Sequence, residues 1–446
     1  MSGHRLLLQA AARTHYMVDK RILYITFDGL LEPLGQSQVL KYVCGLARRG
    51  VSHIVLSLER LPDLDNRSRV EATERELAST GVTWVRGIYH GRTLRNVVAD
   101  CVQAYRNACS VVDTMPVACI HARSYPAALV ACAVRLTRSV PYIFDMRGNW
   151  VEEKAAQRGW PKGGLLYRCA KRLERLLVER SSSIVTLTEV HADDLRHGYS
   201  TVMIDKSLAV IPTCCDYEAF APNRDLDCIP TDICSMISSR LVIGFVGSVN
   251  PSYKVAESLR LFQLLLEERP DAYLLCITRQ IEQLQVLVKA AGIPHNAYEI
   301  TTAEYRDMPS WLSCLDWALL LLSEEQAQRG AMPTKLAELL ASGVRLVQFG
   351  GNSEISRRVL ELESGIVLNS LSERDLKLAA SFIARANISD LQIAFTRQRS
   401  RLYFGLESGL DKYQFSITRL MDETEKSSSR RLRMQQVLTR MQEQQK

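Results

Sequence analysis

Apolar segments of strand length alternate with amphipathic helical segments along most of this 446-residue chain. The first unit has an apolar strand at 21–27, a loop at 28–35, a helix at 36–49 that ends before Gly50, and a second strand at 51–58. Continuously apolar strands that alternate with helices form parallel sheets covered on both faces. The pattern therefore predicts an α/β chain with doubly wound parallel sheets.

The alternation is interrupted once. Residues 223–240 are predicted from their polar composition to form a linker, and a strand at 241–248 then restarts the pattern. A helix is expected at 255–268. Two separate rounds of strand–helix alternation indicate two domains, which the length of the chain allows.

One short helix in the second round carries residues of interest. Residues 332–343 have helical spacing, and a strand at 344–349 follows them. The backbone N–H groups of Thr334 and Lys335 lie at the positive end of this helix, which suits a phosphate. Glu338, one turn later, could accept hydrogen bonds from the hydroxyls of a sugar. The same spacing also fits an ordinary amphipathic helix with solvated Lys335 and Glu338.

Polar side chains follow two strands of the first round. His121 and Arg123 end one strand, and Asp145 and Arg147 end the next one along the chain. Ligands bind at the carboxyl ends of strands in open α/β sheets. A lone histidine at such a place is often structural, whereas four polar residues together indicate a site.

Residues 333–343, Pro-Thr-Lys-Leu-Ala-Glu-Leu-Leu-Ala-Ser-Gly, resemble the donor-binding segment of glycosyltransferase family 4. The resemblance implies a GT-B fold, in which two Rossmann-like domains face a cleft. It also implies that Glu338 binds the nucleotide ribose and that Thr334 and Lys335 contact the donor.

Other positions match the family in the expected order. Gly247 and Lys254 match the loop that neutralises the donor diphosphate, and His121 matches a histidine near the acceptor and the reacting sugar. Gly35 lies in a loop similar to the one where donor and acceptor approach the first helix. The resemblance thus implies catalytic roles for Lys254 and His121, and an acceptor side formed by Gly35, Arg123, Asp145 and Arg147.

Two positions depart from the family pattern. The arginine usual shortly before Lys254 is absent between 248 and 253. A second glutamate, usual eight residues before Glu338 and in contact with the donor sugar, is replaced by Gly330. One interpretation is that other residues of the same loop contact the sugar, namely Glu324, Glu325 and Arg329. The other is that transfer is lost and the protein is a nucleotide-binding partner.

The resemblance covers nearly all of residues 20–422 and gives a domain plan. We expect an N-terminal extension at 1–19, an acceptor-side Rossmann-like domain at 20–222, the linker at 223–240, a donor-binding Rossmann-like domain at 241–390, helices that pack back on the first domain at 391–424, and a basic flexible tail at 425–446.

The function implied is that of a retaining glycosyltransferase of hexosyltransferase type in polysaccharide or glycoconjugate biosynthesis. It would move a sugar from a nucleoside diphosphate sugar to a hydroxyl acceptor, whether a glycan, a lipid-linked molecule or a small molecule. No cofactor or metal is expected, since a helix terminus and basic side chains can stabilise the diphosphate. Asp-x-Asp sequences at 63–65 and 225–227 lie in polar stretches and are discounted as metal ligands. A nucleotide-sugar epimerase and a non-catalytic partner of a transferase are the alternatives.

Charge and composition indicate where such an enzyme would work. The net charge is +7, and the stretch from residue 426 onward holds six basic residues and one acidic residue. A basic excess in a tail argues against a nucleic-acid partner and for peripheral association with an anionic membrane. The helix expected at 165–181 has a basic polar face that fits either solvent or anionic lipid. No apolar run approaches the ~20 residues of a membrane span, and scattered cysteines indicate a cytoplasmic protein.

Overall fold

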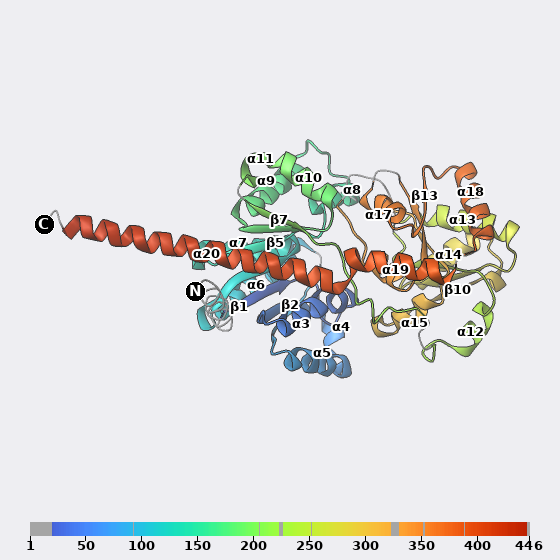
Figure 1. Ribbon diagram of the computed structural model, residues 1–446, viewed down its shortest axis with the longest axis horizontal. Coiled ribbons are helices and arrows are strands. Elements are labelled where there is room, and N and C mark those ends of the chain that lie inside the picture. Colours follow the sequence, from blue (N-terminus) through green and yellow to red (C-terminus); the bar gives the residue numbers. More distant parts are fainter. Residues whose placement is uncertain are drawn as a thin grey trace, which may run out of the picture.

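The computed structural model describes residues 20–443 except residues 92, 205, 223–225, 251, 323–329, 351–352 and 388, with side chains up to residue 426. Two parallel β-sheets flanked by helices lie beside each other in the described chain (Figure 1). The predicted α/β class with doubly wound parallel sheets is confirmed.

The first sheet has the strand order β3-β2-β1-β4-β5-β6-β7, so the order reverses between β1 and β4. Its strands are β1 (Arg21–Thr26), β2 (His53–Glu59), β3 (Thr83–Ile88), β4 (Val117–Arg123), β5 (Tyr142–Asp145), β6 (Ser183–Thr186) and β7 (Ser207–Val210). Its helices are α2 (Pro33–Gly35), η1 (Gln36–Leu40), α3 (Lys41–Arg48), α4 (Leu61–Leu64), α5 (Arg67–Ser79), α6 (Leu94–Thr114), α7 (Ser124–Arg138), α8 (Trp150–Arg158), α9 (Leu165–Arg180), α10 (Glu189–Gly198) and α11 (Ser200–Met203).

The second sheet has the strand order β10-β9-β8-β11-β12-β13 and reverses between β8 and β11. Its strands are β8 (Val242–Val246), β9 (Tyr273–Ile277), β10 (Tyr298–Thr301), β11 (Trp317–Leu320), β12 (Arg345–Phe349) and β13 (Gly365–Leu368). Its helices are α12 (Thr231–Ile237), α13 (Val255–Glu268), α14 (Ile281–Ala290), η2 (His295–Ala297), η3 (Tyr305–Asp307), α15 (Met308–Ser313), α16 (Thr334–Ala341), α17 (Glu354–Glu361) and α18 (Glu373–Arg385).

The two C-terminal helices divide between the domains. Helix α19 (Asp390–Phe404) lies against α16 of the second domain, where the Arg397 guanidinium donates to the carbonyl oxygen of Ala341 at 2.7 Å. Helix α20 (Leu406–Glu443) packs on the first domain and buries Leu410 and Ile417 in its core. Residues 391–424 were expected to pack back on the first domain; α20 does so, and α19 contacts residues 217 and 218 at the end of that domain through Arg397 and Arg401.

Helix α20 continues to Glu443 and extends away from the body of the molecule (Figure 1). A flexible tail was expected from residue 425, whereas the structure has helix over 425–443. Lysine, arginine, glutamine, methionine and leucine dominate this stretch, and all of them favour helix. A second difference lies in the expected linker, where α12 buries Ile233 and Ile237 in the core of the second domain.

The loop at 28–35 is held by a buried carboxylate. Glu59 accepts hydrogen bonds from the backbone N–H groups of Leu30 at 2.8 Å and Leu31 at 3.2 Å. A β-carbon on Gly29 would lie 2.6 Å from a Glu59 carboxylate oxygen, and one on Gly35 would overlap the carbonyl group of Gly29. The glycines therefore allow residues 28–35, which include α2, to fold tightly against β2 before η1 begins.

Two general properties bear on the setting of the chain. All twelve cysteines lie within the described residues and are free thiols. In the described part of the chain, no helix is long and apolar enough to cross a membrane.

Candidate functional site

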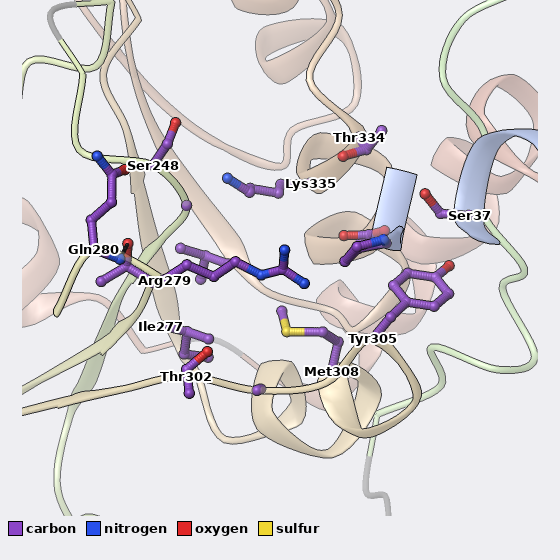
Figure 2. A pocket seen from close by; sticks show the side chains of 16 residues that line it. Ser37, Ser248, Ile277, Arg279, Gln280, Thr302, Tyr305, Met308, Thr334 and Lys335 are labelled. Atoms are coloured by element: carbon purple, nitrogen blue, oxygen red, sulfur yellow. Dashed lines mark hydrogen bonds between the residues drawn. The ribbon is translucent and has the colours of Figure 1, made fainter. Parts of the chain in front are cut away.

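A cavity of about 250 Å³ lies where the two domains meet, beyond the carboxyl ends of β8 and β9 (Figure 2). This edge of an open parallel sheet is where ligands bind. The second domain supplies most of the lining, and the first domain adds two residues from α2 and η1. The lining residues are Pro33, Ser37, Val246, Gly247, Ser248, Ile277, Thr278, Arg279, Gln280, Thr302, Ala303, Tyr305, Met308, Thr334, Lys335 and Glu338.

Helix α16 begins at this cavity. Thr334 and Lys335 are its first two residues, and both line the cavity. Pro333 precedes them as the N-cap in an extended conformation, so the chain enters the helix without a side-chain cap. The N–H groups of this first turn have no partner within the helix and carry the positive end of its dipole. Three predicted donor-binding residues, Thr334, Lys335 and Glu338, are thus brought together.

Lys335 lies over Gly247, a fourth predicted donor residue. Gly247 has φ of +138°, and a β-carbon there would collide with the Lys335 ammonium. The ammonium nitrogen also lies 5.4 Å from the centre of the Tyr253 ring, a cation–π distance. Burial lowers the pKa of Lys335 to about 8, and Glu338 partly offsets this effect. Lys335 is therefore mainly protonated at neutral pH and faces an open cavity, where an anion would stabilise it.

Glu338 is the acidic side chain of the cavity lining. It is 5% exposed, and no hydrogen bond or ion pair to its carboxylate is seen among the described residues. Burial raises the pKa of Glu338 to about 7, against the opposing effect of Lys335. A carboxylate in this position can accept two hydrogen bonds from a ligand that carries neighbouring hydroxyls.

Lys254 lies near the cavity but does not line it. It is the N-cap of α13, and its backbone N–H donates to the carbonyl oxygen of Leu321 at 2.9 Å. The preceding Tyr253 provides the ring beneath the Lys335 ammonium. The role assigned to Lys254 at the diphosphate stays a prediction.

Arg279 is a lining residue that the sequence analysis missed. It follows β9, and its guanidinium points into the middle of the cavity (Figure 2). With Lys335, it is one of two basic side chains in the lining. The rule that ligands meet strand ends, applied to β9, would have identified Arg279. Tyr305 and Met308 were also missed, because only the packing of η3 and α15 brings them to the cavity.

The polar residues predicted at the ends of β4 and β5 do meet, but in a buried network. His121 is 1% exposed and lies between the rings of Tyr24 and Tyr413, with centroid distances of 4.4 and 5.1 Å. Its Nε2 atom is 3.3 Å from Asp145, whose carboxylate also accepts a 2.9 Å hydrogen bond from the Tyr413 hydroxyl. His121 does not line the cavity. Its predicted catalytic role stays untested, and its contacts fit the structural interpretation.

The two arginines of this network lie beside carboxylates near residues 28–35. Arg123 donates to the carboxylate of Asp28 at 2.9 Å, and Arg147 lies 3.7 Å from Asp145. Burial acts to raise the pKa of Asp145, but the charge of Arg147 and the hydrogen bond with His121 lower it to about 2. Gly35 is the last residue of α2, and Pro33 of α2 and Ser37 of η1 line the cavity. The acceptor side predicted here stays a prediction.

Gly330 lies against the first domain. A β-carbon on Gly330 would be 3.1 Å from Nδ1 of His191 and 3.2 Å from the side-chain amide of Asn149. The predicted sugar contacts Glu324, Glu325 and Arg329 lie outside the described residues. Within the described residues, no group of three or more His, Cys, Asp or Glu side chains could hold a metal ion. Independence from metals stays a prediction.

Comparisons with known proteins agree with this geometry. Residues 35–212 match the family described as glycosyl transferase 4-like domain. The structure of sucrose-phosphate synthase from Thermosynechococcus elongatus aligns with a TM-score of 0.69 over 91% of this chain and 100% of its own, at 11% identity. The α,α-trehalose 6-phosphate synthase of Burkholderia multivorans aligns with a TM-score of 0.64 over 91% and 100%, at 13% identity.

A third structure carries ligands. HepE of Anabaena, in complex with UDP and glucose, aligns with a TM-score of 0.60 over 90% of this chain and 99% of its own, at 12% identity. A sequence search of curated proteins found no match. At these identities the structures establish the fold, so the predicted GT-B arrangement is confirmed. The family match likewise confirms the predicted resemblance to glycosyltransferases over the first domain.

Proposed function

Since residues 35–212 carry a glycosyl transferase 4-like domain within a GT-B fold, we propose that this chain transfers a sugar from a nucleoside diphosphate sugar to a hydroxyl acceptor. One observation carries the proposal. The cavity combines a helix N-terminus without a side-chain cap and a lysine at one side with a carboxylate one turn away that has no hydrogen bond or ion pair within the described part of the chain. The N-terminus of α16 and Lys335 suit a diphosphate, and Glu338 suits the ribose hydroxyls.

Transfer needs the diphosphate to leave with the bonding electron pair. The acceptor oxygen bonds to the anomeric carbon while the bond between that carbon and the diphosphate oxygen breaks. The acceptor proton passes to the departing diphosphate. The N-terminus of α16 and Lys335 stabilise the charge that grows on the diphosphate, with Lys254 as a further candidate. Attack on the face that the diphosphate leaves gives retention of anomeric configuration, as the resemblance implies.

The first donors to test follow from the neighbouring structures. Because the HepE structure holds UDP and glucose, we would begin a panel of nucleotide sugars with UDP-glucose. Purified protein would be incubated with each donor and with glycan, lipid-linked and small hydroxyl acceptors, and products would be detected by mass. NMR of the product would report its anomeric configuration.

Each result has a distinct meaning. Transfer with retention supports the proposal, and an inverted product contradicts the retaining mechanism. An isomerised donor without transfer would indicate an epimerase. Nucleotide binding without any turnover would indicate a non-catalytic partner. Glu338→Ala serves as the matched control, because it should lose donor binding while all other residues of the cavity are unchanged.

Peripheral membrane association is a finer part of the proposal. Helix α9 exposes Leu165 and Leu166 at 73% and 64%, beside the basic residues of its polar face. The basic stretch of α20 extends from the same domain (Figure 1). Apolar and basic side chains on one domain suit a surface of anionic lipid, where a lipid-linked acceptor would lie.

A further inference from the structure

A buried carboxylate links the two domains. Glu354, the first residue of α17 in the second domain, is 2% exposed. One of its carboxylate oxygens accepts hydrogen bonds from the backbone N–H groups of Glu189 at 2.6 Å and Val190 at 3.4 Å. These residues begin α10 of the first domain, and their N–H groups have no partner within that helix. The carboxylate of one domain therefore caps a helix of the other.

The other carboxylate oxygen is also fixed. It accepts a 2.7 Å hydrogen bond from the hydroxyl of Tyr403 on α19. Arg357 and Arg358 lie 3.6 and 3.5 Å from the same oxygen, and the Arg358 guanidinium lies 3.8 Å from the centre of the Tyr403 ring. Both oxygens of Glu354 thus have partners, so its charge is compensated despite burial, and its side chain is held in one place.

Helix α10 touches the second domain again two residues later. His191 is 2% exposed, and its Nδ1 atom has no hydrogen-bond partner among the described residues. This atom is the one that a β-carbon on Gly330 would approach to 3.1 Å, next to Asn149. Gly330 leads into the segment that begins α16 and its cavity residues. The position of α10 therefore determines where this part of the first domain meets the segment that leads to α16.

We propose that Glu354 is a positioning residue that seats the N-terminus of α10 and thereby holds His191 beside Gly330, in the segment that leads to α16. The inference rests on the proposed function, since transfer needs donor and acceptor domains in register. The donor residues Lys335 and Glu338 belong to the second domain alone. Loss of the Glu354 contact should therefore change turnover and leave donor binding nearly intact.

The test compares three variants of α17. In Glu354→Ala, kcat should fall about 10- to 100-fold, as for a small misplacement of reacting groups, while the donor Kd stays within about twofold. Glu354→Gln should recover most of the turnover, since its amide oxygen can still accept the α10 N–H groups. Glu361→Ala is the matched control. Glu361 pairs with Arg358 on the same helix but, among the described residues, makes no hydrogen bond or ion pair with α10.

Hydrogen exchange provides a readout that does not depend on turnover. The amides of Glu189 and Val190 should exchange faster in Glu354→Ala than in the parent or in Glu361→Ala. Unchanged kcat and unchanged exchange would overturn the inference. A parallel loss of kcat, donor affinity and thermal stability would also overturn it, because Glu354 would then support only the fold of the second domain. If the parent transfers no sugar, the proposed function fails, and the exchange result still decides the role of Glu354.

Discussion

Donor binding should depend on pH through Glu338. Burial raises the pKa of this carboxyl to about 7, so a substantial fraction is protonated at neutral pH. Ribose hydroxyls donate hydrogen bonds to the ionised form, so a bound donor lowers the pKa and releases a proton on binding. The affinity for the donor should therefore rise as pH increases through 7 and fall as pH decreases.

The structure gives the size of this effect. One pH unit below its pKa, only about one carboxyl in eleven is ionised, so the titration of Glu338 alone would make affinity at pH 6 about tenfold lower than at pH 8. Lys335 acts in the opposite direction, because its pKa is about 8 and a bound diphosphate stabilises its charged form. Affinity should thus fall again above pH 8. Together the two groups predict tightest binding between their pKa values.

Calorimetric titration from pH 5.5 to 9 (about half-unit steps) would measure the profile. The ligand should be an intact nucleotide sugar, since a free nucleoside diphosphate has a terminal phosphate that titrates near pH ~6. Glu338→Gln keeps an acceptor oxygen but cannot titrate, so its affinity should not fall on the acid side. Glu338→Ala should lose roughly 1.5–3 kcal/mol of binding free energy, or ~10- to 150-fold in Kd. An acid limb that persists in Glu338→Gln, or an unchanged Kd in Glu338→Ala, would refute the reasoning.

Three further predictions follow. Lys335→Met should weaken nucleoside diphosphate binding ~10- to 100-fold and leave nucleoside binding within about twofold, because only the charged hydrogen bond is lost; equal losses for both ligands in calorimetry would contradict a phosphate contact. Gly247→Ala should lower the free energy of unfolding by about 1–3 kcal/mol and displace the ammonium, as thermal denaturation and binding would show; Gly163→Ala, at an open position, is the control. Truncation after Thr424 should preserve cooperative unfolding and reduce sedimentation with anionic vesicles, and added salt should weaken the binding of the parent; equal binding by both chains would argue against the membrane proposal.

The elements of the fold could be predicted because their signals are local. The helix expected at 255–268 coincides with α13, since its apolar period and its ends lie within one short segment. By contrast, α12 was missed inside a polar stretch, where two isoleucines are its main apolar signal. The helix expected at 36–49 is divided between η1 and α3, with the short α2 before it, and the tight packing of residues 28–35 accounts for the irregular start.

The site was only partly predictable, because its parts depend on contacts of different range. Thr334, Lys335 and Glu338 share one helix, so spacing alone places them together. Arg279 reaches the same cavity only because β9 lies beside β8 in the sheet. His121 was expected at the cleft because it ends a strand. The long-range packing of α20, which the local pattern cannot show, places Tyr413 against it and its partner Asp145.

Gly330 shows most clearly where sequence reasoning reaches its limit. The missing side chain is visible in the sequence, and it suggested either that Glu324, Glu325 or Arg329 of the same loop takes over a lost contact or that transfer is lost. Those three residues lie outside the described part of the chain, so both interpretations stay predictions. In the structure, His191 and Asn149 of the first domain lie within 3.2 Å of a β-carbon built at Gly330. A side chain at this position would require one of them to give way, and Glu354 holds the N-terminus of the helix α10 that carries His191. Residue 330, α10 and Glu354 therefore belong to one interdomain contact, and a change at any one of them should alter the position of the other two.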